Sequence, residues 1–165
     1  MARSPTPGRA IFTVTTGPEW KRVAAALDAE DKALGDRFRA ELRDASDVLA
    51  RRAQQEVMNI ATHTTRHSGL RARVAKGVGT KLTAGGVIIT SSMNHKDETN
   101  IPAYLDMQKG WRHPVYGNRH EWVLQETGGS WFRATIEDGE QMVERRLTDI
   151  FEDAARTISR ASIGR

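Results

Sequence analysis

The chain contains no cysteine among its 165 residues, and aromatic residues make up only 6% of it. Without cysteine there is no disulfide framework, no thiolate nucleophile and no cysteine-ligated metal. No run of eighteen apolar residues occurs, so the sequence predicts no membrane-spanning segment. Apolar residues account for 38% and charged residues for 28% of the chain, which is ordinary for a globular protein.

The net charge of +4 is modest, but its distribution along the chain is uneven. Residues 63–81 carry five basic side chains and no carboxylate: Arg66, Arg71, Arg73, Lys76 and Lys81. Residues 137–153 carry seven carboxylates against two arginines. Such polarity suits head-to-tail association of copies or a basic face toward nucleic acid, and two solvated faces are the simpler alternative.

Two long helices dominate the expected organisation. Residues 1–10, with two prolines and a glycine, predict a flexible N-terminal arm, and residues 11–165 a single domain that opens with a short extended segment at 11–16. Apolar residues at intervals of three and four predict one helix over 32–61, after a break near 28–35, and another over 131–160. Gly139 would either bend the second helix or permit close packing there, and Ser130 is its expected N-cap.

Between these helices the period changes to two. Leu70, Ala72 and Val74 alternate with arginines, and an apolar run follows a Gly-rich turn, so we expect a β-hairpin with strands near 70–81 and 86–92. A short helix over 101–110, turns at Pro114 and at 117–118, and a strand at 120–125 complete the pattern. The sequence therefore predicts an α+β fold: a small antiparallel β-sheet packed by a long N-terminal helix and a long C-terminal helix.

Three of the four tryptophans fall within residues 111–131. Large rigid side chains in a turn-rich stretch need burial in a core or against a partner. Trp122 and Phe132 are expected in the core, because one lies on a strand and the other on the apolar stripe of a helix. Trp111, Tyr116 and Trp131 lie at expected loop positions, where core packing and a subunit contact both remain open.

No arrangement of residues indicates catalysis. His63 and His67 have helical ligand spacing but no further ligand, and His113, Asn118 and His120 lack the metal ligands that a His-Asn-His nuclease carries on a following helix. We therefore expect no cofactor, no metal and no enzymatic activity. Contact with the DNA backbone, without base reading, is better supported by the basic stretch.

Three features together resemble a phage protein family. A long Arg/Ala/Glu-rich helix leads through a Thr-x-x-x-Gly-Leu-Arg link at residues 65–71 into a Gly-rich hairpin. The segment Arg-His-Pro-Val-Tyr-Gly-Asn-Arg at residues 112–119 follows, with Trp122 soon after, and Gly-Gly-Ser-Trp-Phe at 128–132 introduces the last helix. Over residues 20–160 the chain resembles the neck, or tail-completion, proteins of long-tailed double-stranded DNA phages, a family related to minor tail protein Z. It departs from the family pattern at residues 66–70 and 107–111.

The resemblance implies a structural virion protein, made in the bacterial cytoplasm, that forms a homo-oligomeric ring of six in the neck. Its expected neighbours are a head-completion (stopper) protein and a tail terminator or tail tube protein, with double-stranded DNA passing through the lumen. The expected subunit or partner contacts are Trp111, His113, Pro114, Tyr116, Asn118 and Trp131. The expected DNA-lumen or inter-subunit basic face comprises Arg66, Arg71, Arg73, Lys76 and Lys81. The alternative is a basic DNA-binding or nuclease-like accessory protein.

Overall fold

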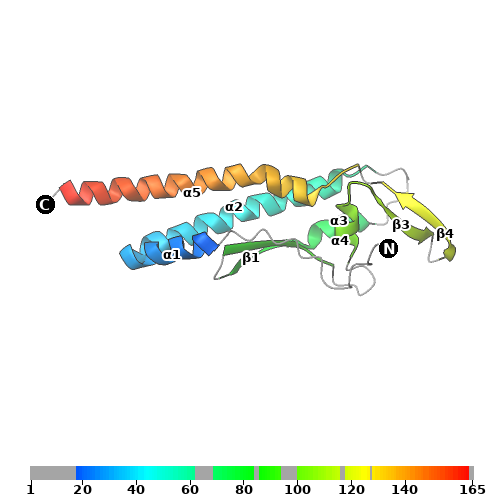
Figure 1. The fold of residues 1–165 in the computed structure, drawn as a ribbon, viewed down its shortest axis with the longest axis horizontal. Coiled ribbons are helices and arrows are strands. Elements are labelled where there is room, and N and C mark those ends of the chain that lie inside the picture. Colours follow the sequence, from blue (N-terminus) through cyan, green and yellow to red (C-terminus); the bar gives the residue numbers. More distant parts are fainter. Residues whose placement is uncertain are drawn as a thin grey trace.

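The computed structural model describes residues 18–61, 69–83, 86–93, 100–115, 118–126 and 128–163. The expected N-terminal arm and the extended segment at 11–16 lie outside these residues. Three helices make up most of the described part: α1 (Pro18–Glu30), α2 (Lys32–Asn59) and α5 (Phe132–Ile163). Figure 1 shows α2 and α5 side by side along the length of the molecule, with α1 folded back against α2.

The predicted break between the first two helices is confirmed, and it is located at Asp31. This residue has an extended backbone (φ −155°, ψ 115°), and its side chain accepts a hydrogen bond from the backbone N–H of Ala33 at 2.8 Å, as an N-cap does. Gly35 is not the break itself. It lies inside α2, where a Cβ atom would come within 1.9 Å of Asp28 Oδ1 on α1, so glycine permits the close approach of the two helices.

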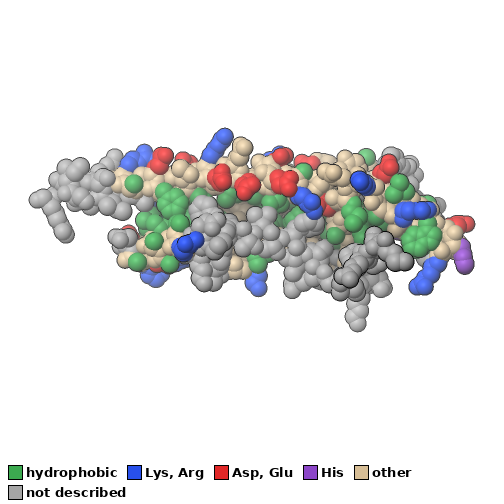
Figure 2. Space-filling view, in the orientation of Figure 1, with side chains coloured by type: hydrophobic (Ala, Val, Ile, Leu, Met, Phe, Trp, Pro, Cys, Tyr) green, Lys and Arg blue, Asp and Glu red, His purple; other side chains and the backbone are tan. Residues whose placement is uncertain are grey.

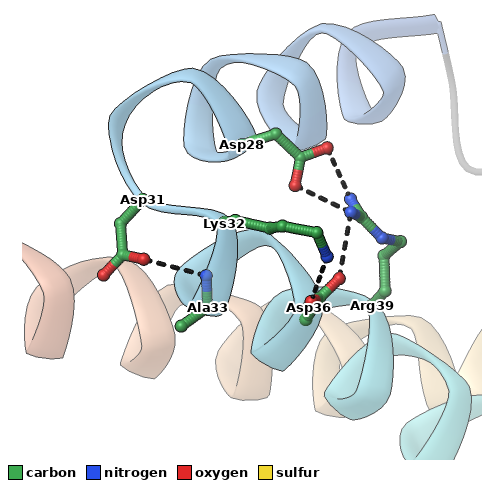
Figure 3. A network of polar contacts seen from close by, with 6 residues as sticks. All are labelled: Asp28, Asp31, Lys32, Ala33, Asp36 and Arg39. Carbon is green, nitrogen blue, oxygen red and sulfur yellow. Dashed lines mark hydrogen bonds and ion pairs between the residues drawn. The ribbon is translucent and has the colours of Figure 1, made fainter.

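Figure 3 shows the ion pairs at this corner, of which the pair between Arg39 and Asp28 joins α2 to α1. Arg39 contacts Asp28 at 2.7 Å and Asp36 at 3.3 Å, and Lys32 contacts Asp36 at 2.7 Å. The hydrogen bond from Arg39 holds the pKa of Asp28 below its usual range, and the bond from Lys32 does the same for the pKa of Asp36. These groups are solvent-exposed, so the network orients α1 more than it stabilises the fold.

The core lies between α2 and its neighbours. The apolar stripe predicted for α2 is buried, and its members pack on α5, on α3 and on the first hairpin: Phe38, Leu42, Leu49, Ala53 and Val57. Gly139 allows close packing, because a Cβ atom there would lie 2.0 Å from Cδ2 of Leu49. The helix runs through Gly139 without interruption, so of the two alternatives the close contact is the one observed.

The strand predicted over 70–81 is wrong in its first half. Residues Leu70–Lys76 form helix α3, and β1 begins only at Val78. Leu70, Val74 and Ala75 pack against the core while Ala72 is exposed, which is a helical spacing and not an alternation. Over seven residues the two periods share Leu70 and Val74, so the sequence pattern did not separate them. Gly69 starts the helix with φ +70°, a conformation that favours glycine.

The strands form two separate antiparallel hairpins. β1 (Val78–Thr83) pairs with β2 (Gly86–Ser91), with Val78 opposite Ser91, and Val87 and Ile89 point into the core. β3 (Trp111–Val115) pairs with β4 (Asn118–Gln125), with a register shift between Pro114 and Val115. Between the hairpins, α4 (Ile101–Leu105) is shorter than the predicted helix over 101–110. The α+β class with long helices at both ends is confirmed.

Candidate interaction surfaces

The β3–β4 hairpin projects from the end of the molecule opposite α1 and carries the largest exposed apolar side chains (Figures 1 and 2). Every residue of β4 is exposed, and Trp122, Val123 and Leu124 keep 49%, 42% and 55% of their surface accessible. The prediction that Trp122 is a core residue is therefore wrong. Its Nε1 donates a hydrogen bond to the carbonyl oxygen of Arg119 at 2.9 Å, so the ring folds over its own strand.

The two faces of this hairpin differ in what they contact. By strand alternation Trp122 and Leu124 share one face of the hairpin. Their cross-strand partners on β3, Pro114 and Arg112, lie on the same face. Pro114, expected in a turn, lies instead within β3 next to the register shift, where its missing N–H is tolerated. The face with Trp122 and Leu124 thus presents an apolar surface to solvent.

Trp111 and His113 lie on the other face, which turns toward α4. Trp111 is part-buried against the core and stacks on Tyr104, with ring centroids 6.1 Å apart and an interplanar angle of 15°. His113 lies 5.8 Å from the Trp111 ring, and its Nε2 is 3.1 Å from Oε1 of Gln125. Of these contacts, the stack on Tyr104 joins the hairpin to α4, while the contacts of His113 lie within the hairpin.

The remaining residues predicted as partner contacts do not lie on one common surface. Asn118 is exposed and accepts a hydrogen bond from the backbone N–H of His120 at 3.1 Å, while Tyr116 lies outside the described residues. The prediction that Trp131 contacts a partner is wrong. Its side chain is only 5% exposed and meets the ring of Phe132 edge-on, with the ring centroids 5.3 Å apart. It belongs to the core of its own chain and is not available to a partner. Phe132 is buried as predicted.

Asp106, just before the hairpin, is hydrogen-bonded to residues that follow the hairpin at the start of α5. The sequence analysis did not identify this residue. Its Oδ1 accepts hydrogen bonds from Ser130 Oγ at 2.9 Å, from the Phe132 N–H at 2.7 Å and from the Arg133 N–H at 3.3 Å. The N-cap of α5 is therefore supplied by Asp106 from α4, and the predicted cap, Ser130, donates to it instead. Because the partners are about 25 residues apart in the chain, no local pattern marks the contact.

The predicted basic face is only partly assembled. Arg71 and Arg73 do not share a strand face, because both lie on α3. Arg71 donates to the carbonyl oxygens of Met58 and Ile60 at 2.8 and 2.6 Å and so caps the end of α2. Arg73, Lys76 and Lys81 are exposed, and Arg66 lies outside the described residues. The described part of this region, residues 69–83 and 86–93, contains no carboxylate.

The outer side of α5 carries the acidic surface. Its exposed carboxylates form a row that Figure 2 shows as red side chains along the helix: Glu137, Asp138, Glu140, Glu144, Asp149 and Glu152. Glu152 is near Arg156 at 4.0 Å. Asp153, at the edge of the row, pairs with Arg37 of α2 at 2.7 Å.

The histidines and carboxylates of the described residues do not gather into a metal-binding cluster. Among them no group of three or more His, Asp or Glu side chains could hold a metal ion. His113 is engaged with Gln125, and His120 is exposed on β4, so the residues of the nuclease alternative do not converge. His63 and His67 lie outside the described residues. None of the described helices is long and apolar enough to cross a membrane.

Comparison with known proteins returned no relationship: no family model, no curated protein and no solved structure matches the chain.

Proposed function

We propose that this chain is a structural, non-enzymatic virion protein of the neck of a long-tailed double-stranded DNA phage. It forms a homo-oligomeric ring, of six copies by resemblance to the family, that joins the portal–stopper complex to the tail terminator or tail tube and lets DNA pass. The observation that carries the proposal is the β3–β4 hairpin, an apolar arm whose second strand is exposed along its whole length.

Two properties of the hairpin support a contact with another protein. An exposed tryptophan such as Trp122 belongs to the residue types enriched at the centres of protein interfaces, and Leu124 on the same strand adds exposed apolar area. The segment on which the family resemblance depends, residues 112–119, contributes four residues of β3 and the first two of β4. The most distinctive part of the sequence and the exposed apolar side chains of β4 thus lie in the same hairpin.

The orientation of the hairpin suits a defined joint rather than a loose tether. The stack of Trp111 on Tyr104 and the clamp by Asp106 hold its base, while Trp122 and Leu124 remain free at its outer face. An interface residue that is preoriented loses less conformational entropy on binding.

The test is an inventory of purified particles of the phage that encodes this chain. We expect the chain in complete virions, and its absence from them would remove the proposal. A phage with the double substitution Trp122→Ala and Leu124→Ser should produce filled heads and tails that do not join. The isolated variant should unfold within about 0.5 kcal/mol of the wild-type chain, because both side chains are half exposed.

Met58→Gln is the matched control, because Met58 is 44% exposed but lies on α2 and not on the hairpin. It should leave the yield of infectious particles unchanged. Normal joining in the hairpin variant would contradict the role given to this arm.

The alternative, a basic DNA-binding accessory protein, has the exposed Lys76 and Lys81 in its favour. It predicts salt-dependent affinity of the isolated chain for a DNA fragment, weakened by Lys76→Glu and Lys81→Glu. The nuclease form of this alternative also predicts metal-dependent cleavage that His113→Ala abolishes.

A further inference from the structure

We infer that copies of this chain associate head to tail through two surfaces of opposite charge, the outer side of α5 and the α3–β1 surface. The inference deepens the proposed ring by naming the interface between its subunits, and it rests on that proposed function. The acidic surface comprises five carboxylates, Glu137, Asp138, Glu140, Glu144 and Asp149. The basic surface comprises Arg73, Lys76 and Lys81.

The acidic surface is not neutralised within its own chain. All five carboxylates are exposed, and no ion pair or side-chain hydrogen bond joins them to another described residue. Glu140 and Glu144 are four residues apart on the helix, and like charges at this spacing repel one another by a few tenths of a kcal/mol, so a cationic partner would relieve this repulsion.

The two lysines of the basic surface are likewise unmatched among the described residues. Residues 69–83 and 86–93 contain no carboxylate, and neither Lys76 nor Lys81 has an ion-pair partner among the described residues. Leu82, which is 40% exposed beside Lys81, adds apolar area to the same surface.

The two surfaces cannot meet within one molecule, because α2 lies between them. It packs against α5 on one side and against α3, β1 and β2 on another (Figure 1).

A second copy is the occupant that satisfies both surfaces at once. DNA would match the basic surface but leave the acidic one without a partner. Two different surfaces on one chain make a heterologous contact, which repeats from copy to copy and closes into a ring when the rotation permits.

The experiment is a charge exchange on the full-length chain, followed by sedimentation velocity at millimolar protein concentration in low and high salt. The wild-type chain should self-associate in low salt and dissociate in high salt. Reversal of the basic surface by Lys76→Glu and Lys81→Glu, or of the acidic surface by Glu137→Lys, Glu140→Lys and Glu144→Lys, should raise the dissociation constant at least about tenfold.

The decisive measurement is a mixture of the two reversed variants. Each variant presents two surfaces of like charge, and each complements the other, so an equimolar mixture should recover assemblies with alternating subunits in a 1:1 ratio. Recovery also shows that both variants are folded. The control variant, Arg22→Glu with Arg52→Glu, changes the net charge as much as the basic reversal does, but on α1 and α2, and it should associate as the wild type does.

Three results would overturn the inference: a wild-type chain that stays monomeric in low salt, a mixture that stays monomeric, or a basic-surface variant that loses affinity for a DNA fragment while its self-association is unchanged. The particle inventory tests the neck function separately. A chain absent from virions would remove that function and leave a successful charge exchange standing.

Discussion

Replacement of Asp106 by alanine should destabilise the chain more than any other single substitution of a carboxylate in its described part. The side chain is only 6% exposed, and one of its oxygens accepts three hydrogen bonds at the start of α5. Loss of an N-cap costs about 1 kcal/mol. A buried backbone N–H left without a partner, here that of Phe132, costs roughly 1–3 kcal/mol. Because these contributions overlap, we expect Asp106→Ala to lower the free energy of unfolding by about 2–3 kcal/mol.

The measurement is urea denaturation followed by circular dichroism, with amide hydrogen exchange as a local readout. Exchange at the Phe132 N–H should accelerate in Asp106→Ala even under conditions where the chain remains folded. The substitution Asp106→Asn separates the contribution of the capping hydrogen bonds from that of the negative charge. The amide oxygen still accepts hydrogen bonds, so the loss should be limited to roughly 0.3–1 kcal/mol, the contribution of a negative charge near a helix N-terminus.

Asp138→Ala is the matched control, because Asp138 is an exposed carboxylate on α5, the helix whose start Asp106 caps. It should shift the free energy of unfolding by no more than about 0.5 kcal/mol. If Asp106→Ala were as mild as this control, the clamp at the base of the hairpin segment would not contribute to stability, and the reasoning would be refuted.

Two further substitutions test the packing of the helices. Gly139→Ala should lower the free energy of unfolding by about 1 kcal/mol, because overpacking against Leu49 (~1–3 kcal/mol) outweighs the helix propensity gained (~1 kcal/mol). In a Leu49→Ala background the same change should raise it, and a loss there would contradict the contact. Arg39→Ala should raise the pKa of Asp28 toward its usual value in a carboxyl NMR titration. The folded-state pKa of Asp28 is lowered, so its contribution to stability is present above the unfolded pKa and disappears as pH falls through the folded pKa. An unchanged pKa would show that the pair does not form.

The sequence by itself determined the elements that have a long, regular period. The apolar stripes of α2 and α5 repeat over seven or more turns, so their existence, and the break before α2, follow from local spacing and capping chemistry. The α+β class follows from the same pattern. The short segment 70–76 did not contain enough residues to distinguish a helix from a strand.

The tertiary structure alone decided which side chains are covered. Alternation along β4 says that Trp122 and Val123 face opposite ways, but not that both side chains stay exposed. Trp131, in contrast, is buried because Asp106 fixes the start of α5 against α4 across about 25 intervening residues. Long-range contacts of this kind depend on where the chain returns in space, and local periodicity contains no information about that. The aromatic-rich segment therefore divides into a buried tryptophan, a stacked one and an exposed one, a division that only the packed structure reveals.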